Sequence, residues 1–125
     1  MNPQEIFDTI SKHLLTQKKK ALNSKNYCLY RTDNDLKCAI GCLIPDDLYD
    51  PEIEGFSVAD CFCSTKPKGG LEKLQNILAK LNLDDNKILL ERIQSIHDDN
   101  QPEYWLYGLN RLAKEFKLSN ANEQS

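Results

Sequence analysis

The sequence lacks the features that mark secreted and membrane proteins. Its first ten residues, MNPQEIFDTI, hold no basic segment followed by an apolar run, as a signal peptide would. No stretch elsewhere approaches the length of apolar sequence that crosses a bilayer. These absences argue against a membrane protein and predict that the chain works in the cytoplasm.

The sequence also lacks an excess of basic residues. It has 16 Lys and Arg against 19 Asp and Glu, a formal net charge of -3 and a pI near 5.4. Duplex nucleic acid is bound mainly by neutralising phosphates, so this balance argues against nucleic acid as the main partner. No cofactor-binding motif is present, and we expect no cofactor. The run Lys18, Lys19 and Lys20 is interpreted as the solvated end of a helix.

Length and composition describe one globular domain. A chain of 125 residues, 40% hydrophobic and 28% charged, buries enough surface to fold without a metal or a disulfide. Five cysteines are many for this size, and in a reducing compartment they are free thiols, metal ligands or one reactive thiol. We expect the domain to span residues 1–118, followed by a polar, frayed tail over residues 119–125.

The first half predicts one long helix and then a small β-hairpin. Asn2 can cap a helix that starts at Pro3, Glu5 can return a bond to the cap, and the helix should fade after Lys20. The residues 27–30 and 36–38 favour strands, and TDND between them is typical of a turn. The run CAIGCLI is predicted to form a short helix that Pro45 ends, and SVADCF another.

The second half is predicted to be helical. Its apolar residues recur at helical spacing, and Asn100 with Glu103 resembles a cap before the last helix. The sequence therefore predicts an α+β fold: a mostly helical single domain with a small β-hairpin. The three apolar stripes are Leu71, Leu74, Leu78 and Leu81; Leu89, Ile93 and Ile96; and Trp105, Leu109, Leu112 and Phe116.

Three segments resemble a group of small uncharacterised proteins encoded by bacteriophages and prophage-bearing bacterial genomes. They are YRTDNDLKCAIGCLIPDDLYDPEIEG, IQSIHDDNQPEYW and LNRLAKEF, and the likeness covers roughly residues 6–118. Asn34 and Asp35 stand where the group has a glycine, and Ile53 where it has a methionine. The resemblance implies a mobile-element accessory protein, and it brings no catalytic residue with it.

An acidic segment follows the cysteine-rich run. It lacks the alternating oxygen ligands and turn glycine of a calcium loop, so a solvated loop, a nucleic-acid mimic or a surface for a basic partner fits better. We expect Arg31 to anchor it through a charge-assisted bond to one of its carboxylates. The residues predicted to bind a partner are Asp46, Asp47, Tyr49, Asp50, Glu52 and Glu54.

A thiol site is the catalytic alternative. Cys38 falls where a helix is expected to begin, and exposed amides there stabilise thiolates. His97, followed by Asp98, could serve as its base, with Asp98 fixing the tautomer of the imidazole. The structural interpretation is that Cys38 and Cys42 are small core residues and that His97 caps a helix end. His13, the other histidine, is interpreted as surface.

A zinc site is the remaining alternative. It would use Cys38, Cys42, Cys61 and Cys63, with Cys28 or His97 as a further ligand. The spacing of the two cysteine pairs departs from structural zinc motifs, so we predict no metal.

The sequence thus predicts a phage or mobile-element accessory protein. We expect it to act in the cytoplasm as a protein-binding module whose partner is a host or bacterial protein, one of defence or regulation. The alternative is a cysteine-dependent hydrolase or acyl transferase using Cys38 and His97.

Overall fold

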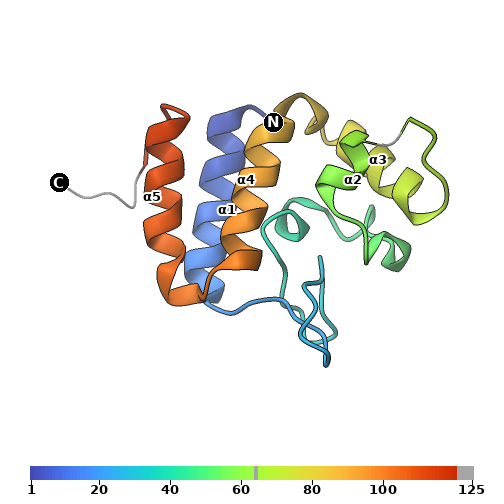
Figure 1. Cartoon of the computed structure of the whole chain (residues 1–125), viewed down its shortest axis with the longest axis horizontal. Coiled ribbons are helices and arrows are strands. Elements are labelled where there is room, and N and C mark those ends of the chain that lie inside the picture. Colours follow the sequence, from blue (N-terminus) through green and yellow to red (C-terminus); the bar gives the residue numbers. More distant parts are fainter. Residues whose placement is uncertain (64, 121–125) are drawn as a thin grey trace.

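The computed structural model describes residues 1–63 and 65–120, and within them the protein is helical (Figure 1). The predicted α+β class is therefore wrong, because the described residues contain no sheet and no hairpin. The helices are α1 (Pro3–Gln17), η1 (Gly41–Leu43), η2 (Pro51–Ile53), α2 (Val58–Cys63), α3 (Gly70–Lys80), η3 (Asp84–Asn86), α4 (Lys87–Asp99), η4 (Pro102–Tyr104) and α5 (Trp105–Glu115), where η marks a single 3₁₀ turn.

Helix α1 begins as the sequence predicts. The side chain of Asn2 accepts from the backbone N–H of Glu5, and the side chain of Glu5 accepts from that of Asn2, which completes a capping box. The helix ends earlier than expected, at Gln17, because Lys18 adopts a left-handed conformation with φ 56° and its N–H bonds to the carbonyl of Leu14.

Two tight loops replace the predicted hairpin. Each is closed by one isolated bridge, Leu22 with Cys28 and Arg31 with Lys37. Asn26 and Asp35 have positive φ, at 65° and 66°, so the chain reverses before a second pair of residues can join either bridge. The segment TDND forms a turn, as its sequence predicts. The segments on either side of it are too short to pair as strands.

The cysteine-bearing run forms less helix than predicted. Only η1 is helical, and Cys38 precedes it. A Cβ on Gly41 would lie 1.9 Å from the carbonyl oxygen of Tyr30, so η1 is pressed against the preceding loop at this position. This packing fixes the segment as a single turn against the core, whereas SVADCF forms α2 as expected.

The apolar stripes of α3, α4 and α5 are confirmed, but the cap before α5 is wrong. Leu74 and Leu78, Leu89 and Ile93, and Leu109 are all buried. Asn100 ends α4 instead, where its side-chain amide donates to the carbonyl of Ile96 at 3.4 Å. Pro102 then starts η4, which leads directly into α5.

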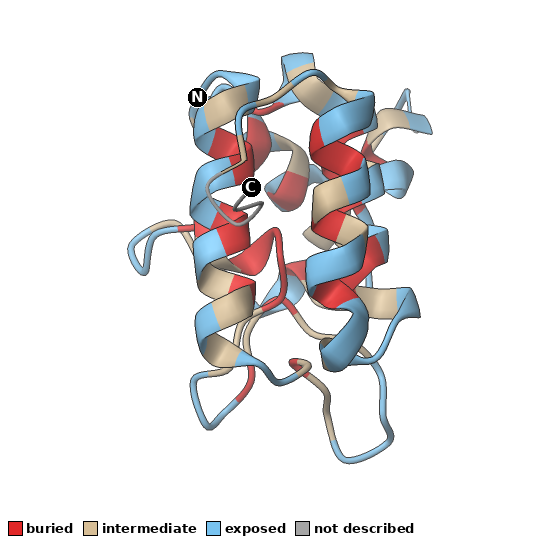
Figure 2. Ribbon diagram, turned by 90° about the vertical axis from the view of Figure 1, so that its left-hand side faces the viewer, coloured by how far each residue is buried: buried red, intermediate tan, exposed pale blue. Residues whose placement is uncertain are grey.

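Helices α1, α4 and α5 lie side by side, and α2 and α3 pack beyond α4 (Figure 1). Their buried faces turn inward and their exposed faces outward (Figure 2). Trp105 and Phe7 are the largest fully buried side chains of one hydrophobic cluster. The irregular segment between α1 and α2 contributes Tyr30, Cys38 and Ile53 to the same cluster, so its loops are held by the core.

The start of the predicted tail is bound to α1. Ser119 donates its N–H to the side chain of Gln4 and accepts from the same side chain, both at 2.9 Å. Residues 121–125 of the predicted tail lie outside the described residues.

Candidate functional site

The inner half of the acidic segment binds the protein's own backbone. Both carboxylate oxygens of Glu54 accept backbone N–H groups, from Tyr30 at 2.8 Å and from Arg31 at 3.1 Å. The hydroxyl of Tyr49 also donates to Glu54, at 2.8 Å. Glu54 and Tyr49, both predicted to bind a partner, therefore hold the loop at residues 28–31 onto the segment around η2.

Asp50 and Glu52 also have internal partners. Asp50 accepts from the backbone N–H of Glu52 at 2.9 Å and caps η2, and Lys73 of α3 lies 3.0 Å from Asp50 and 2.6 Å from Glu52. The N–H of Glu52 and then the ammonium of Lys73 hold the pKa of Asp50 below its usual value. These exposed ion pairs tie α3 to the acidic segment and add little stability of their own.

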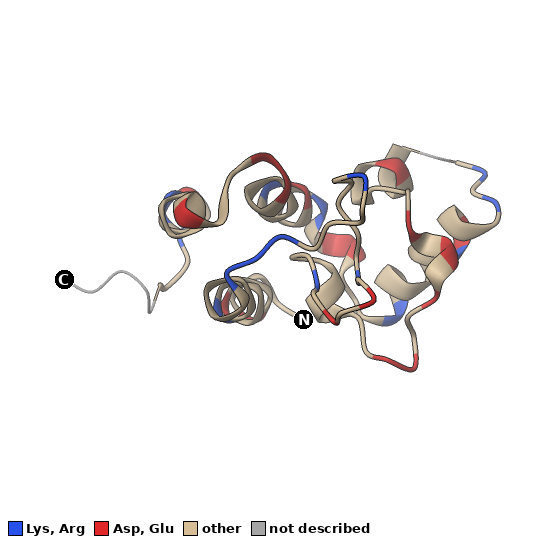
Figure 3. Ribbon diagram, turned by 90° about the horizontal axis from the view of Figure 1, so that it is seen from below, with Lys and Arg blue, Asp and Glu red and all other residues tan. Residues whose placement is uncertain are grey.

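Asp46, Asp47 and Glu52 are the exposed members of the set, and Glu52 is paired with Lys73. The expected anchor is confirmed: Arg31 lies 2.9 Å from Asp46, whose side chain is 88% exposed, and its guanidinium sits 4.4 Å above the ring of Tyr49. Asp47 is exposed. In the charge-coloured view, acidic positions lie on both helices and loops, and the chain that leaves α1 at residues 18–20 forms a continuous basic stretch (Figure 3).

Cys38 lies in the core. It is 1% exposed, and its sulfur accepts a hydrogen bond from the backbone N–H of Gly41 at 3.2 Å. That contact, with the first residue of η1, is the amide interaction expected for a thiolate at a helix start. Burial outweighs it and raises the pKa of Cys38 far above the ordinary value, so the thiol is protonated and enclosed.

His97 is fully buried at the end of α4, and both of its ring nitrogens are engaged. Nδ1 lies 2.7 Å from the carboxylate of Asp98, and Nε2 accepts from the backbone N–H of Ala21 at 3.1 Å. Because the backbone N–H of Ala21 can only donate, Nε2 is unprotonated, and the ring carries its proton on Nδ1, which donates a hydrogen bond to the carboxylate of Asp98. The ring also stacks on Trp105, with centroids 5.3 Å apart. The predicted pairing of His97 with Asp98 is present.

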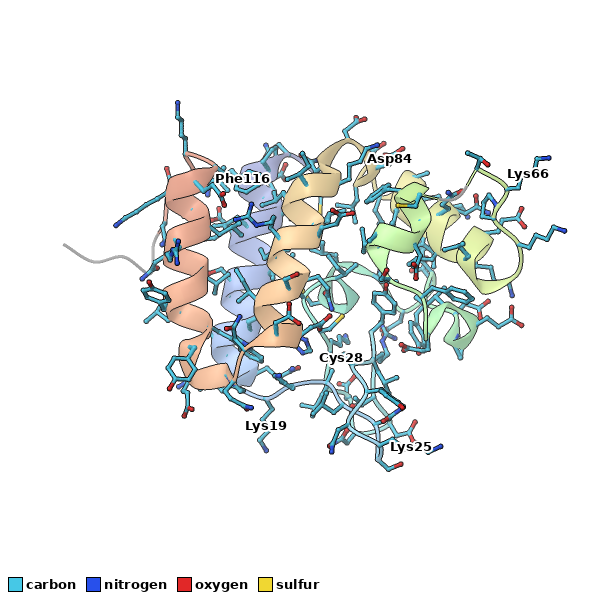
Figure 4. The ribbon with its side chains drawn as sticks, viewed as in Figure 1. Lys19, Lys25, Cys28, Lys66, Asp84 and Phe116 are labelled. Carbon is cyan, nitrogen blue, oxygen red and sulfur yellow. The ribbon has the colours of Figure 1, made fainter. Side chains whose placement is uncertain are left out.

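Cys28, rather than Cys38, lies beside this pair. The ligand-type atoms of Cys28, His97 and Asp98 all lie within 4.8 Å of one another. Figure 4 labels Cys28 in the loop below the end of α4. Burial, and then the charge of Asp98 and a hydrogen bond to it, raises the pKa of the Cys28 thiol to about 11. Cys28 is therefore a protonated donor to Asp98.

The three groups are not ordered as in a thiol hydrolase. In such enzymes the imidazole lies between thiol and carboxylate and takes the thiol proton. Here the carboxylate of Asp98 lies between, and the free lone pair of His97 faces Ala21. Cys28 and Asp98 border a cleft of about 320 Å³, which Cys38 and Gln94 also line.

The four cysteines of the zinc alternative do not converge. Within residues 1–63 and 65–120, the group formed by Cys28, His97 and Asp98 is the one set of at least three such ligands that come together. Cys42 donates to the carbonyl of Ala39 at 3.0 Å, and Cys63 is exposed at the end of α2.

A second candidate site, which the sequence reasoning missed, is a groove between α4 and α5. It measures about 670 Å³, and Gly108 lies in it, where a Cβ would come within 3.3 Å of Ile96. Tyr104 and Tyr107 stand along it, 58% and 65% exposed. Its remaining lining includes Arg92, Asn100, Arg111, Leu112 and Glu115.

The groove combines exposed aromatic rings with guanidinium groups. Arg111 lies 5.7 Å from the ring of Tyr107, and among the described residues no carboxylate lies within ion-pair distance of it. Arg92 pairs with Glu115 across the groove. The spacing of Tyr104, Tyr107 and Arg111, three and four apart on a helix whose stripe begins at Trp105, was the available signal.

Comparison of the chain with protein families, with curated proteins and with solved structures finds no match. No helix in the described parts of the chain is both long enough and apolar enough to span a membrane.

Proposed function

We propose that the protein is a protein-binding module and that the groove between α4 and α5 is its binding surface. The observation that carries the proposal is the exposure of Tyr104 and Tyr107 beside Arg111. Tyrosine and arginine are the residue types that most often dominate binding energy at protein interfaces. On the other helical faces, Trp105 and Phe7 are buried and Phe62 is partly buried.

The rigidity of the groove supports this role. Tyr107 and Arg111 project from α5, whose opposite face is fixed in the core by Trp105 and Leu109. A binding surface on a packed helix loses little conformational entropy when a partner docks, because its backbone is already ordered. The groove therefore needs no rearrangement before it binds.

The charge of the groove selects the partner. Among the residues that the structure describes, the guanidinium of Arg111 contacts the ring of Tyr107 and pairs with no carboxylate, whereas Arg92 pairs with the carboxylate of Glu115. A partner segment that carries a carboxylate beside an apolar or aromatic side chain would fit the groove. Its carboxylate would form a bidentate bond with Arg111, and its apolar side chain would pack on the tyrosine rings. The occupant we propose is thus an acidic segment of another protein.

The resemblance to phage-encoded proteins supports the origin and setting of the interaction. It favours a mobile-element accessory protein acting in a bacterial cytoplasm, with a host protein of defence or regulation as the partner. In this proposal two exposed acidic residues, Asp46 and Asp47, form a secondary contact. Asp50, Glu52 and Glu54 hold other parts of the chain in place and are left out of it.

Affinity purification with matched variants tests the proposal. Tyr107→Ser is compared with Tyr27→Ser. The two tyrosines are equally exposed, at 65% and 66%, but Tyr27 lies outside the groove. We expect a host protein that the unaltered chain and Tyr27→Ser retain, and that Tyr107→Ser and Arg111→Glu lose. Retention should fall as salt rises, since exposed charge attraction is screened.

Two results would overturn the proposal. One is a partner that Tyr107→Ser and Arg111→Glu retain as well as the unaltered chain does. The other is retention that nuclease treatment abolishes, which would assign the groove to nucleic acid, where arginine and tyrosine also bind by stacking.

A further inference from the structure

We infer that Cys28, His97 and Asp98 form a binding site for a zinc-type transition metal ion. Cys28 comes from the loop after α1, and the other two residues come from the last turn of α4. The site is separate from the groove between α4 and α5, and it uses a different cysteine from those that the sequence suggested.

The distances suit a metal ion. One sulfur, one imidazole nitrogen and one carboxylate oxygen lie within 4.8 Å of one another, and the Nδ1 of His97 is 2.7 Å from the carboxylate of Asp98. Ligand atoms around tetrahedral zinc stand about 3.3–3.7 Å apart, as bond lengths of about 2.0–2.3 Å require. Nδ1 of His97 and the carboxylate of Asp98 must therefore move apart by about half an ångström to admit the ion, which side-chain rotation allows.

The ligand types select the metal. Thiolate and imidazole are ligands of zinc and of neighbouring transition metals, whereas magnesium and calcium take oxygen atoms. Cys28 and Asp98 border the cleft of about 320 Å³, so an ion can enter from that side and keep its fourth position open there. Gln94, whose amide donates to Asp98 at 2.9 Å, would serve as an outer partner that orients the carboxylate.

One hydrogen bond competes with the metal. When Nδ1 of His97 binds an ion, its proton resides on Nε2, which then faces the N–H of Ala21 and can no longer accept from it. Loss of a neutral hydrogen bond weakens binding by about ten- to a hundredfold. The proposal requires that the affinity of the thiolate and the imidazole for zinc exceeds this loss and that the loop at residue 21 adjusts.

Cobalt(II), which replaces zinc and absorbs visible light, tests the site. Reduced, metal-free full-length protein is titrated with cobalt chloride, and we expect one equivalent to bind with a thiolate-to-cobalt charge-transfer band. Cys28→Ser should abolish the band while the circular dichroism is unchanged. Asp98→Asn should weaken cobalt binding by more than ~10–100-fold, the effect expected for a residue that only hydrogen-bonds to a metal ligand.

Cys63→Ser is the matched control, because Cys63 is exposed and lies outside the group. It should leave both the band and the affinity unchanged. A titration without a charge-transfer band, or a band that Cys28→Ser retains, would overturn the proposal. Neither result bears on the groove between α4 and α5, so the two proposals fail separately.

Discussion

The backbone N–H of Ala21 donates to Nε2 of His97, 76 residues later in the chain, over 3.1 Å. On the same side, the ammonium of Lys20 donates to the carbonyl of Asp98 at 3.0 Å. These two bonds hold the chain that leaves α1 against the end of α4. Because that chain leads into the loops carrying Cys28 and Tyr30, His97 organises the irregular half of the molecule.

His97→Ala is therefore expected to destabilise the protein strongly. The change leaves the N–H of Ala21 buried without an acceptor and opens a cavity against Trp105. Together these effects should lower the free energy of unfolding by about 2–4 kcal/mol, measured by urea denaturation. Asp99→Asn, at an exposed neighbour, should change it by less than about 0.5 kcal/mol. Equal effects of the two variants would mean that His97 has no organising role.

Glu54 and Glu52 make a matched pair within the acidic segment. Glu54→Ala removes the acceptor of two backbone N–H groups, those of Tyr30 and Arg31, and should lower the free energy of unfolding by about 2–3 kcal/mol. Glu52→Ala breaks an exposed ion pair with Lys73 and should cost less than about 0.5 kcal/mol. A similar decrease in the free energy of unfolding for both variants would show that Glu54 does not accept the two backbone N–H groups in solution.

Gly41 is predicted to tolerate no side chain. Its Cβ would lie 1.9 Å from the carbonyl oxygen of Tyr30, which is backbone and cannot rotate away, so Gly41→Ala should lower the free energy of unfolding by about 3 kcal/mol or more. At Gly108 the nearest atoms, 3.3 Å away, belong to the flexible side chain of Ile96. Thermal melts should show Gly108→Ala within a few degrees of the unaltered protein, and a reversed order would contradict the packing of η1.

The pKa of Asp50 depends on η2 and on Lys73. Since the pKa is below its unfolded value, the contribution of Asp50 to stability is complete above the unfolded pKa and is lost as pH falls through the folded one. Lys73→Met should raise the pKa of Asp50, but not fully to the usual value, because the N–H of Glu52 still donates. Carboxyl NMR titration measures the change. An unaltered pKa would mean that the two side chains do not meet.

The order of thiol labelling tests the catalytic alternative. Burial raises the pKa of Cys42 to about 12 and that of Cys38 further, and Cys63 is exposed. Iodoacetamide at neutral pH should therefore modify Cys63 well before Cys38, as read by peptide mass spectrometry. Labelling of Cys38 ahead of Cys63, slowed by His97→Ala, would instead support the hydrolase.

Local signals in the sequence were sufficient to locate the long helices, though not all of their ends. The capping box of Asn2 and Glu5 and the apolar stripes of α3, α4 and α5 act within one or two turns, and the structure confirms them. The hairpin failed because strand propensity at residues 27–30 says nothing about how many residues pair. In the structure this stretch follows a tight turn instead of a strand. The side chain of Asn23 closes the turn by accepting from two backbone N–H groups, those of Lys25 and Tyr27.

The candidate sites depended on contacts across the chain. His97 and Asp98 could be paired from the sequence because they are neighbours, but their thiol could not, since Cys28 reaches them only after the chain turns at Lys18. The acidic run likewise did not reveal that Glu54 points inward while Asp47 points outward. Tyr107 could have been singled out, because it falls on the opposite face of α5 from the Trp105 stripe.

Site-specific photo-crosslinking in host cells tests the groove most directly. A benzophenone side chain is placed at Tyr107 and, in a separate protein, at Tyr27, which is equally exposed. We predict a discrete protein adduct from position 107 that Arg111→Glu suppresses, and no such adduct from position 27. An adduct that forms equally from both positions, or from position 27 alone, would contradict a binding surface between α4 and α5.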